Sequence, residues 1–147
     1  MRQLLKDRVF LAMALELSRL STCARRDVGA IMVDRRHHII ASGYNGPAPD
    51  MPHCKDTPCP GASLPSGTGL EACEAIHAEQ NALIQCKFPE RIDTVYLTDS
   101  PCVACVKMLS VTSARRIVFA RLYPHVESEV LWRKWGGRLW EHVPLSS

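Results

Sequence analysis

The stretch Ile76-His77-Ala78-Glu79-Gln80-Asn81-Ala82-Leu83 organises this chain, together with the later stretch Ser100-Pro101-Cys102-Val103-Ala104-Cys105. One imidazole and two thiolates can occupy three corners of a zinc tetrahedron and leave the fourth corner for water, which is the arrangement of a catalytic zinc. We therefore expect His77, Cys102 and Cys105 to bind a zinc ion.

Glu79 adds a proton-transferring group to this site. Zinc lowers the pKa of its bound water toward about 7, and a carboxylate that does not bind the metal can then move the proton. The pattern H-x-E followed by P-C-x-x-C is typical of zinc nucleobase deaminases, in which the glutamate is the general acid and base. Taken singly, a C-x-x-C pair could be a redox pair or half of a structural zinc site, and a helical histidine is usually packed or solvated. The combination favours a catalytic zinc.

The composition bounds the class of protein. Of the 147 residues, 46% are apolar and 22% charged, which is ordinary for a globular protein, and we expect a single domain over 1–147. No apolar run approaches the roughly 18 residues of a membrane span, and the first residues do not resemble a signal peptide, so a cytoplasmic protein without a membrane partner is expected. The net charge of +3 is too small to indicate nucleic-acid binding, and it suits an anionic small substrate equally well.

Periodicity predicts alternating helices and strands. An amphipathic helix is expected over 3–20, followed by a hairpin of strands at 28–34 and 38–42. Helices are then expected at 74–87, 101–113 and 125–135, and strands at 94–98, 117–120 and 138–143. This order predicts a three-layer α/β/α domain with a five-stranded mixed sheet and helices on both faces, in which a crossover helix lets the last two strands run parallel. The C-terminal tryptophans Trp132, Trp135 and Trp140 could cover the core or a subunit contact, and we expect the core.

The order of the elements also constrains the site. Glu79 and the two site cysteines would lie at the beginnings of their helices, where partial positive charge favours carboxylate and thiolate. Residues two apart on a regular helix, however, point about 200° away from each other. His77 and Glu79 can therefore share a pocket only if the motif occupies the first, irregular turn.

The chain has a loop over 45–69 that is rich in Pro and Gly and has no periodicity. Of the seven cysteines, Cys54 and Cys59 lie in this loop, Cys73 follows it, and the turn after Cys23 could bring that residue alongside. A loop of this length inside a compact domain is expected to be functional or held by a cross-link. Four thiolates can provide such a cross-link by forming a closed structural zinc site. The candidate ligands are Cys23, Cys54, Cys59 and Cys73. Reduced thiols, some buried as small apolar groups, are the alternative, and His53 could also replace one of the cysteines.

With these motifs located, the chain resembles the deoxycytidylate (dCMP) deaminases of the cytidine deaminase superfamily, from about Ser18 to Tyr123. The Tyr-Asn-Gly loop followed by a His-Ala-Glu-x-Asn-Ala helix separates this family from its relatives, whereas P-C-x-x-C is shared by the whole superfamily. The resemblance rests on Val28-Gly29-Ala30-Ile31-Met32-Val33, Gly43-Tyr44-Asn45-Gly46, His53-Cys54, Cys73 and the two stretches quoted above.

The resemblance implies a cytidine deaminase-like fold and the hydrolytic deamination of dCMP to dUMP and ammonia, which supplies dUMP for dTMP synthesis. It implies a catalytic zinc on the three ligands named above, with Glu79 moving the proton, and a second, structural zinc on Cys23, Cys54, Cys59 and Cys73. It places Asn45 against the sugar and ring, and Arg25 or Arg26 with Tyr123 at the 5′-phosphate. Groups near Ala78 and Ser100 could read the base edge. It also implies a homo-oligomer such as a hexamer.

Two positions depart from the family pattern. In this family the asparagine-glycine pair is often followed by Gly-Gly, which helps to bind a deoxynucleoside triphosphate regulator, and here Pro47-Ala48-Pro49 follows. Because proline removes backbone donors, a cradle for dCTP or dTTP is in doubt. Asp99, just before Ser100, is a charged residue at a place where a less polar one is expected, and it could alter the pocket rim.

Other functions remain open at this point. The substrate could be cytidine, a 5-substituted dCMP or tRNA adenosine, although an RNA editor would use aromatic stacking and a basic groove, and only 6% of the residues are aromatic. The non-enzymatic alternative is a zinc-stabilised nucleotide-binding protein, which predicts that Glu79 is dispensable.

Overall fold

Helices and strands alternate along the chain, as the periodicity predicts. The computed structural model describes residues 2–65, 68 and 72–145, and the part of the chain that it describes forms a five-stranded sheet with four α-helices. The elements are α1 (Arg2–Ser18), β1 (Gly29–Val33), β2 (Ile39–Tyr44), α2 (Ala78–Gln85), the short 3₁₀ helix η2 (Pro89–Arg91), β3 (Thr94–Asp99), α3 (Val103–Ser110), β4 (Arg116–Arg121), α4 (Val126–Arg133) and β5 (Leu139–His142).

The sheet is mixed, in the order β2-β1-β3-β4-β5. β1 runs antiparallel to both β2 and β3, whereas β3, β4 and β5 are parallel to one another. The crossover helices α3 and α4 connect these parallel strands, because two parallel neighbours cannot be joined by a tight turn. The predicted parallel pairing of the last two strands is thus confirmed, and the fold class is the one expected.

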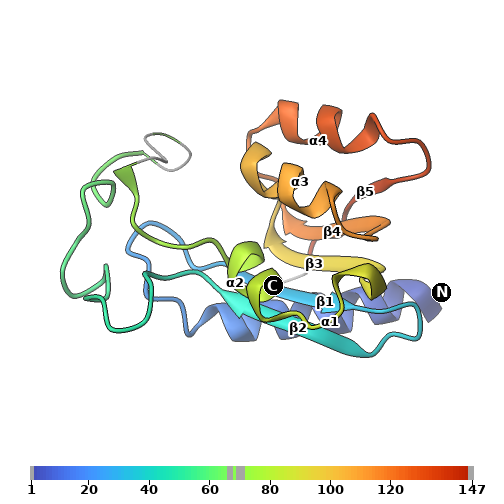
Figure 1. Ribbon diagram of the computed structural model, residues 1–147, viewed down its shortest axis with the longest axis horizontal. Coiled ribbons are helices and arrows are strands. Elements are labelled where there is room, and N and C mark those ends of the chain that lie inside the picture. Colours follow the sequence, from blue (N-terminus) through green and yellow to red (C-terminus); the bar gives the residue numbers. More distant parts are fainter. Residues whose placement is uncertain (1, 66–67, 69–71, 146–147) are drawn as a thin grey trace.

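The two faces of the sheet bury different side chains, because successive residues of a strand point to opposite sides. On β3, Val95 and Leu97 belong to the larger core cluster, which also contains side chains of α2 and α3, and Tyr96 belongs to the smaller cluster with Leu11 and Ala14 of α1. Figure 1 shows the resulting layers, with α1 on one side of the sheet and α3 and α4 on the other, while the loop after β2 extends away from them.

The helix that carries the His-x-Glu motif approaches the sheet unusually closely. A Cβ atom at Gly43 of β2 would lie 2.6 Å from the carbonyl oxygen of Ala78 and 2.6 Å from the backbone nitrogen of Ala82, both on α2. Only glycine allows such contact between backbones. Gly43 therefore fixes how deep the first turn of α2 sits against β2.

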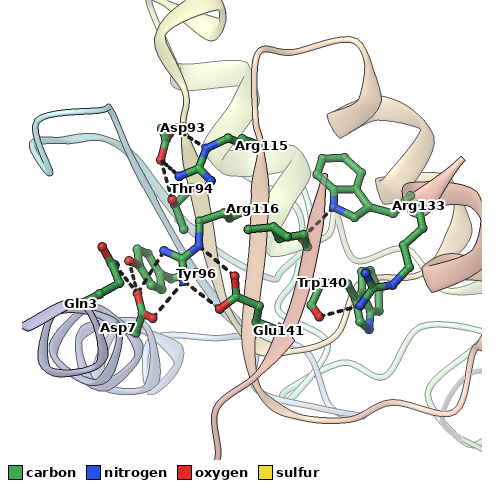
Figure 2. Close-up of polar contacts among 12 residues, drawn as sticks. Gln3, Asp7, Asp93, Thr94, Tyr96, Arg115, Arg116, Arg133, Trp140 and Glu141 are labelled. Carbon is green, nitrogen blue, oxygen red and sulfur yellow. Dashed lines mark hydrogen bonds and ion pairs between the residues drawn. The ribbon is translucent and has the colours of Figure 1, made fainter. Parts of the chain in front are cut away.

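A polar network joins α1 to the sheet at the opposite face (Figure 2). The guanidinium group of Arg116 on β4 donates to both carboxylate oxygens of Asp7, at 2.9 and 3.2 Å, and to Glu141 of β5 at 2.9 and 3.0 Å. The hydroxyl of Tyr96 donates to Asp7 at 2.7 Å. Each partner of the buried Arg116 comes from a different element, so the network fixes α1 relative to β3, β4 and β5.

Two expectations were wrong. The helix expected over 74–87 begins only at Ala78, because Ile76 forms an extended bridge with Gly46, with N–H···O distances of 2.8 and 3.1 Å. Trp132 and Trp140 are buried as expected, but Trp135 is 62% exposed because it lies beyond the end of α4. In the described ranges, none of the helices combines the length and the apolar character that crossing a membrane requires.

Candidate active site

The His-x-Glu motif occupies the first turn of α2, which is irregular as the geometry of the motif demands. His77 is the N-cap residue and has an extended backbone, with φ −69° and ψ 153°, while Glu79 already lies in the helix. The backbone N–H of His77 donates to the side chain of Gln80 at 2.8 Å, which caps the helix start. The change from extended to helical backbone between them lets His77 and Glu79 line the same pocket.

The two cysteines of the P-C-x-x-C stretch lie at the beginning of α3. Cys102 is the N-cap residue, with φ −73° and ψ 169°, and its carbonyl accepts the N–H of Val106 at 3.0 Å. Cys105 follows one turn later and is completely buried. The start of a helix carries partial positive charge, which stabilises thiolates.

The two helix starts bring the three candidate ligands together. The Nδ1 atom of His77 lies 3.2 Å from Sγ of Cys105 and 3.6 Å from Sγ of Cys102. All three ligand atoms lie within 4.8 Å of one another. A zinc tetrahedron with nitrogen and sulfur ligands has edges of about 3.6 Å at the usual bond lengths. The three side chains therefore fit a zinc ion, and a tetrahedral ion held by three protein ligands keeps one position open.

The electrostatics of the three candidate ligands favour one thiolate, at Cys102, whereas the hydrogen bond to Cys102 and burial raise the pKa of the Cys105 thiol. The hydrogen bond to Cys105 and the contact with His77 lower the pKa of the Cys102 thiol to about 3 against the cost of burial. The hydrogen bond to Cys102 raises the pKa of His77. One thiolate is thus already favoured before any metal is bound, and a cation would compensate its charge.

Glu79 is buried beside this cluster and is not one of the three clustered ligands. It is 4% exposed, and burial raises the pKa of its carboxyl group. Its side chain is hydrogen-bonded to Cys105. A carboxyl group with a raised pKa that lies close to a candidate metal site and lines a pocket is suited to accept and return a proton.

The pocket at this site is lined by all of the residues that the sequence singled out for substrate contact, and by His77, Glu79 and Cys102. The substrate-contact candidates are Arg25, Arg26, Asn45, Ala78, Ser100 and Tyr123. They come from the turn before β1, the end of β2, the start of α2 and the segments that follow β3 and β4. The carboxyl ends of parallel strands are the usual place for a ligand site in such a sheet.

Asn45 supports the turn before β1 as well as lining the pocket. Its Oδ1 atom accepts the N–H of Val28 at 2.9 Å, and its Nδ2 atom donates to the carbonyl of Arg26 at 2.8 Å. An amide side chain has one further donor hydrogen and one further lone pair. Asn45 can therefore hold the Arg26 turn and contact a ligand at the same time.

The two candidate arginines face different partners. Arg25 donates through Nη2 to the carbonyl oxygens of Pro65 and Thr68, so it ties down the long loop. Arg26 lies with its guanidinium carbon 3.8 Å from the centre of the Tyr123 ring, and its Nη1 atom is 3.3 Å from Oδ2 of Asp99. Of the two, Arg26 is the one held by two pocket-lining side chains.

Ser100 shapes the pocket through the backbone of Tyr123. Its hydroxyl accepts the Tyr123 N–H at 2.7 Å and donates to the Tyr123 carbonyl at 3.3 Å. Ala78 is fully buried at the start of α2. Three further lining residues, Val28, Ala75 and Asp99, were not among the sequence candidates. Asp99 was identifiable only as a departure from the family pattern.

Among the four candidate ligands of a second zinc, Cys23 and Cys73 line the pocket, and Cys59 contacts both Cys54 and Cys73. Sγ of Cys54 lies 3.5 Å from Sγ of Cys59, and the thiol of Cys59 is also hydrogen-bonded to Cys73. Burial raises the pKa of Cys73, and the nearby thiols of Cys23 and Cys59 raise it further. The structure thus brings together residues that lie far apart in the sequence, and His53 is exposed.

Comparison with known proteins places this arrangement among zinc deaminases. Residues 5–121 match the model of the "Cytidine and deoxycytidylate deaminase zinc-binding region". The chain is 36% identical over 123 residues to a deoxycytidylate deaminase of Mycobacterium phage D29, which covers 78% of this chain and 94% of the phage protein. It is 31% identical over 122 residues to a deoxycytidylate deaminase of Schizosaccharomyces pombe, covering 80% of this chain but only 37% of that protein.

A solved structure agrees with the sequence comparison. The dCMP deaminase of cyanophage S-TIM5, determined in complex with dCMP and dUMP, superposes with a TM-score of 0.68 and is 25% identical in sequence. The similarity covers 90% of this chain and 93% of the phage chain. The likeness thus extends over nearly the whole of both chains.

Proposed function

Because this chain belongs to the cytidine and deoxycytidylate deaminase family, we propose that it is a zinc-dependent hydrolase that converts dCMP to dUMP and ammonia. The observation that carries the proposal is the cluster of His77, Cys102 and Cys105 at two helix starts, with Glu79 buried beside it and facing the same pocket. Phage relatives named for dCMP deamination, one of them solved with dCMP and dUMP, support this choice of substrate.

In this proposal each residue of the pocket has a defined role. Zinc bound by His77, Cys102 and Cys105 would lower the pKa of a water molecule, so that hydroxide becomes available for attack at C4 of cytosine. Glu79 would take one proton from that water and pass it to the ring nitrogen. It would then move the proton of the new C4 hydroxyl to the amine, so that the C4–N bond breaks, ammonia leaves and the C4 carbonyl forms. Burial of Glu79 raises its pKa, which brings the carboxyl group closer to the pH at which it must both accept and donate.

The opposite end of the pocket would hold the sugar and the 5′-phosphate. Asn45 lies where it can contact the nucleoside while it supports the turn that carries Arg26. A guanidinium group matches the geometry of phosphate oxygens, and Arg26 beside Tyr123 is better placed for this than Arg25, which faces the loop. Ala78 and Ser100 would border the base.

The loop cysteines would hold a second, structural zinc. Four thiolates make a closed tetrahedral site, and the mutual approach of Cys54, Cys59 and Cys73, with Cys23 nearby, supports it. Such an ion would stabilise a loop that has little apolar content of its own. We also propose that residues 1–147 form one deaminase unit and that this unit assembles into a homo-oligomer, such as the hexamer that the family resemblance implies.

The experiment that tests the proposal is a deamination assay on a panel of cytosine substrates. Purified, zinc-loaded protein is given dCMP, 5-methyl-dCMP, deoxycytidine, cytidine and dCTP, and ammonia release is measured with and without dCTP and dTTP as effectors. We expect the highest kcat/KM with dCMP. Highest activity on a nucleoside would replace the substrate, and no activity on any of them would overturn the proposal.

The variant Glu79→Gln separates catalysis from binding. A general acid and base contributes typically about 10²–10⁴-fold, so ammonia release should fall by at least that factor. The zinc content should remain at that of the wild type, because Glu79 is not among the clustered ligands. Unchanged turnover would instead favour a nucleotide-binding protein whose chemistry does not use this carboxylate.

A further inference from the structure

Asp99 lies at the carboxyl end of β3 and contacts two arginines. One is Arg121 at the end of the parallel strand β4, and the other is Arg26. Asp99 is directly opposite Arg121 in the register of the two strands, and its Oδ1 atom accepts Nε of Arg121 at 2.7 Å. Its other oxygen, Oδ2, lies 3.3 Å from Nη1 of Arg26, which comes from the turn before β1. Asp99 is 8% exposed, so one buried carboxylate joins two guanidinium groups from distant parts of the chain.

Arg26 is held by contacts on two sides. The ring of Tyr123 supports the flat face of the guanidinium group at 3.8 Å, and the carboxylate of Asp99 fixes its edge. A guanidinium over an aromatic ring is attracted to it but can still slide and rotate in the plane of the ring. The hydrogen bond to Asp99 removes this freedom, and it leaves other N–H groups of Arg26 to bind a ligand.

The support under Arg26 is itself tied to Asp99. Ser100, the residue after Asp99, binds both backbone polar groups of Tyr123 through its hydroxyl, and its own N–H donates to the carbonyl of Arg121 at 3.0 Å. The segment that carries Tyr123 is therefore bound to the segment that carries Asp99. The aromatic ring and the carboxylate that contact Arg26 thus belong to two segments that are hydrogen-bonded to each other.

We propose that Asp99 is a positioning residue that holds Arg26 in place for the 5′-phosphate of the substrate. The inference rests on the proposed function, since it assumes a nucleotide whose base lies at His77 and Glu79. Arg26 lines the pocket with those two residues, so an anionic group at the far end of the same ligand meets its guanidinium group. A pre-oriented guanidinium loses less freedom when it binds phosphate, which improves affinity.

The opposite expectation is that a carboxylate this close to a phosphate would repel it. Asp99 faces Arg26 with one oxygen and Arg121 with the other, so its negative charge is more than balanced by its two partners. The cluster of these three residues keeps a net positive charge. Loss of Asp99 would add positive charge but free both guanidinium groups, and the geometry favours orientation as the larger effect.

The test compares substrates with and without phosphate. KM and kcat are measured for dCMP and for deoxycytidine with the wild type, Asp99→Asn, Arg26→Gln and the double variant. We expect Asp99→Asn to raise the KM for dCMP about five- to tenfold, with little change in kcat, and to leave kcat/KM for deoxycytidine unchanged. In the Arg26→Gln background, Asp99→Asn should have no further effect on dCMP, because the residue acts through Arg26.

The control variant is Asp93→Asn, which alters a comparable pair at the other end of β3. Asp93 lies 3.2 Å from Nε of Arg115 (Figure 2), away from the residues that line the pocket. It should leave the ratio of the two KM values at the wild-type level. If Asp99→Asn does not fold with its full zinc content, Asp99→Glu, which keeps the charge but moves it, should raise the KM for dCMP in the same selective way.

Three results would overturn the inference: an unchanged or lower KM for dCMP in Asp99→Asn, an equal loss on both substrates, or an additive loss in the double variant. Binding of dUMP and deoxyuridine is measured by calorimetry in parallel, so that the role of Asp99 is tested without turnover. A wild type that deaminates neither substrate refutes the proposed function. If such a protein binds dUMP more weakly after Asp99→Asn while its binding of deoxyuridine is unchanged, the positioning role stands. If the binding of neither ligand is weakened, the inference fails.

Discussion

Asp7→Asn should destabilise the protein strongly, because Asp7 is the buried partner of a buried arginine. The side chains of Arg116 and Asp7 are 6% and 4% exposed, whereas Glu141, the other partner of Arg116, is 35% exposed. The substitution keeps the shape of the side chain and removes its charge. The guanidinium group is then left with one half-buried carboxylate, and Tyr96 and Gln3 lose a charged acceptor.

The expected loss follows from these contacts. Breaking a buried ion pair by removing one partner typically costs about 3–5 kcal/mol, and the remaining Glu141 places this case at the lower end, at about 3 kcal/mol. Unfolding entropy of about 2.1 cal/mol/K per residue gives about 0.3 kcal/mol/K for this chain, so Tm should fall by about 10 °C. The measurement is urea and thermal unfolding of zinc-loaded protein, followed by circular dichroism.

Two comparisons make this prediction refutable. Glu16→Gln, which breaks the exposed pair with Arg19, should cost no more than about 0.5 kcal/mol. The double variant Asp7→Leu with Arg116→Met removes both buried charges and should be clearly more stable than the sum of the two single losses predicts. A loss below about 1 kcal/mol in Asp7→Asn, or strict additivity in the double variant, would refute the reasoning.

The free energy of unfolding that Asp7 contributes should decrease as the pH falls. Burial alone would raise the pKa of Asp7, but hydrogen bonds from Arg116, Tyr96 and Gln3 outweigh it and hold the pKa below its ordinary value of 3.8. The unfolded state therefore binds the proton first as the pH falls. The stability that Asp7 contributes should be complete above about pH 5 and should be lost as the pH falls through 3.8 toward the lower native pKa.

Further predictions concern the metal sites and the contact between α2 and β2. Cys102→Ser should abolish ammonia release and remove about one zinc ion per chain, as measured by atomic absorption; an active, fully loaded variant would contradict the ligand assignment. Cys54→Ser should remove the other zinc and lower Tm while the catalytic zinc remains, and unchanged zinc content would argue for reduced thiols in the loop. Gly43→Val should lower both Tm and kcat, because its side chain would collide with the backbone of Ala78 and Ala82. An unchanged kcat would show that the depth of α2 does not position the site.

The cluster of His77, Cys102 and Cys105 could be predicted from the sequence because each half of the candidate site is local. His77 and Glu79 are two residues apart, and that spacing already demanded an irregular turn, which the extended backbone of His77 provides. Pro101 before Cys102 likewise predicts a helix start close to the cysteines. The start of α2 was misplaced because the residues before His77 have no breaker, and the bridge between Ile76 and Gly46 is a tertiary contact.

The contacts at the proposed phosphate end of the pocket could not be predicted in the same way. Arg26 and Asp99 are 73 residues apart in sequence, and their pairing exists only because β1 and β4 both lie next to β3. Neither periodicity nor motif spacing contains that information. The sequence identified Asp99 only as an unexpected charge, and Arg121 carried no signal at all.

Different parts of the fold position the two ends of the pocket. The candidate metal end depends on two helix starts, whose local geometry is fixed by Gly43 under α2 and by the N-cap residue Cys102. The proposed phosphate end depends on the register of β3 against β4, because that register sets Asp99 opposite Arg121 and brings Tyr123 under Arg26. Both ends meet at the carboxyl edge of β3, where Asp99 and Cys102 are separated by only Ser100 and Pro101. A shift of β3 by one residue would therefore turn Asp99 to the other face of the sheet and displace Cys102 with it, so the two ends of the pocket depend on the same register.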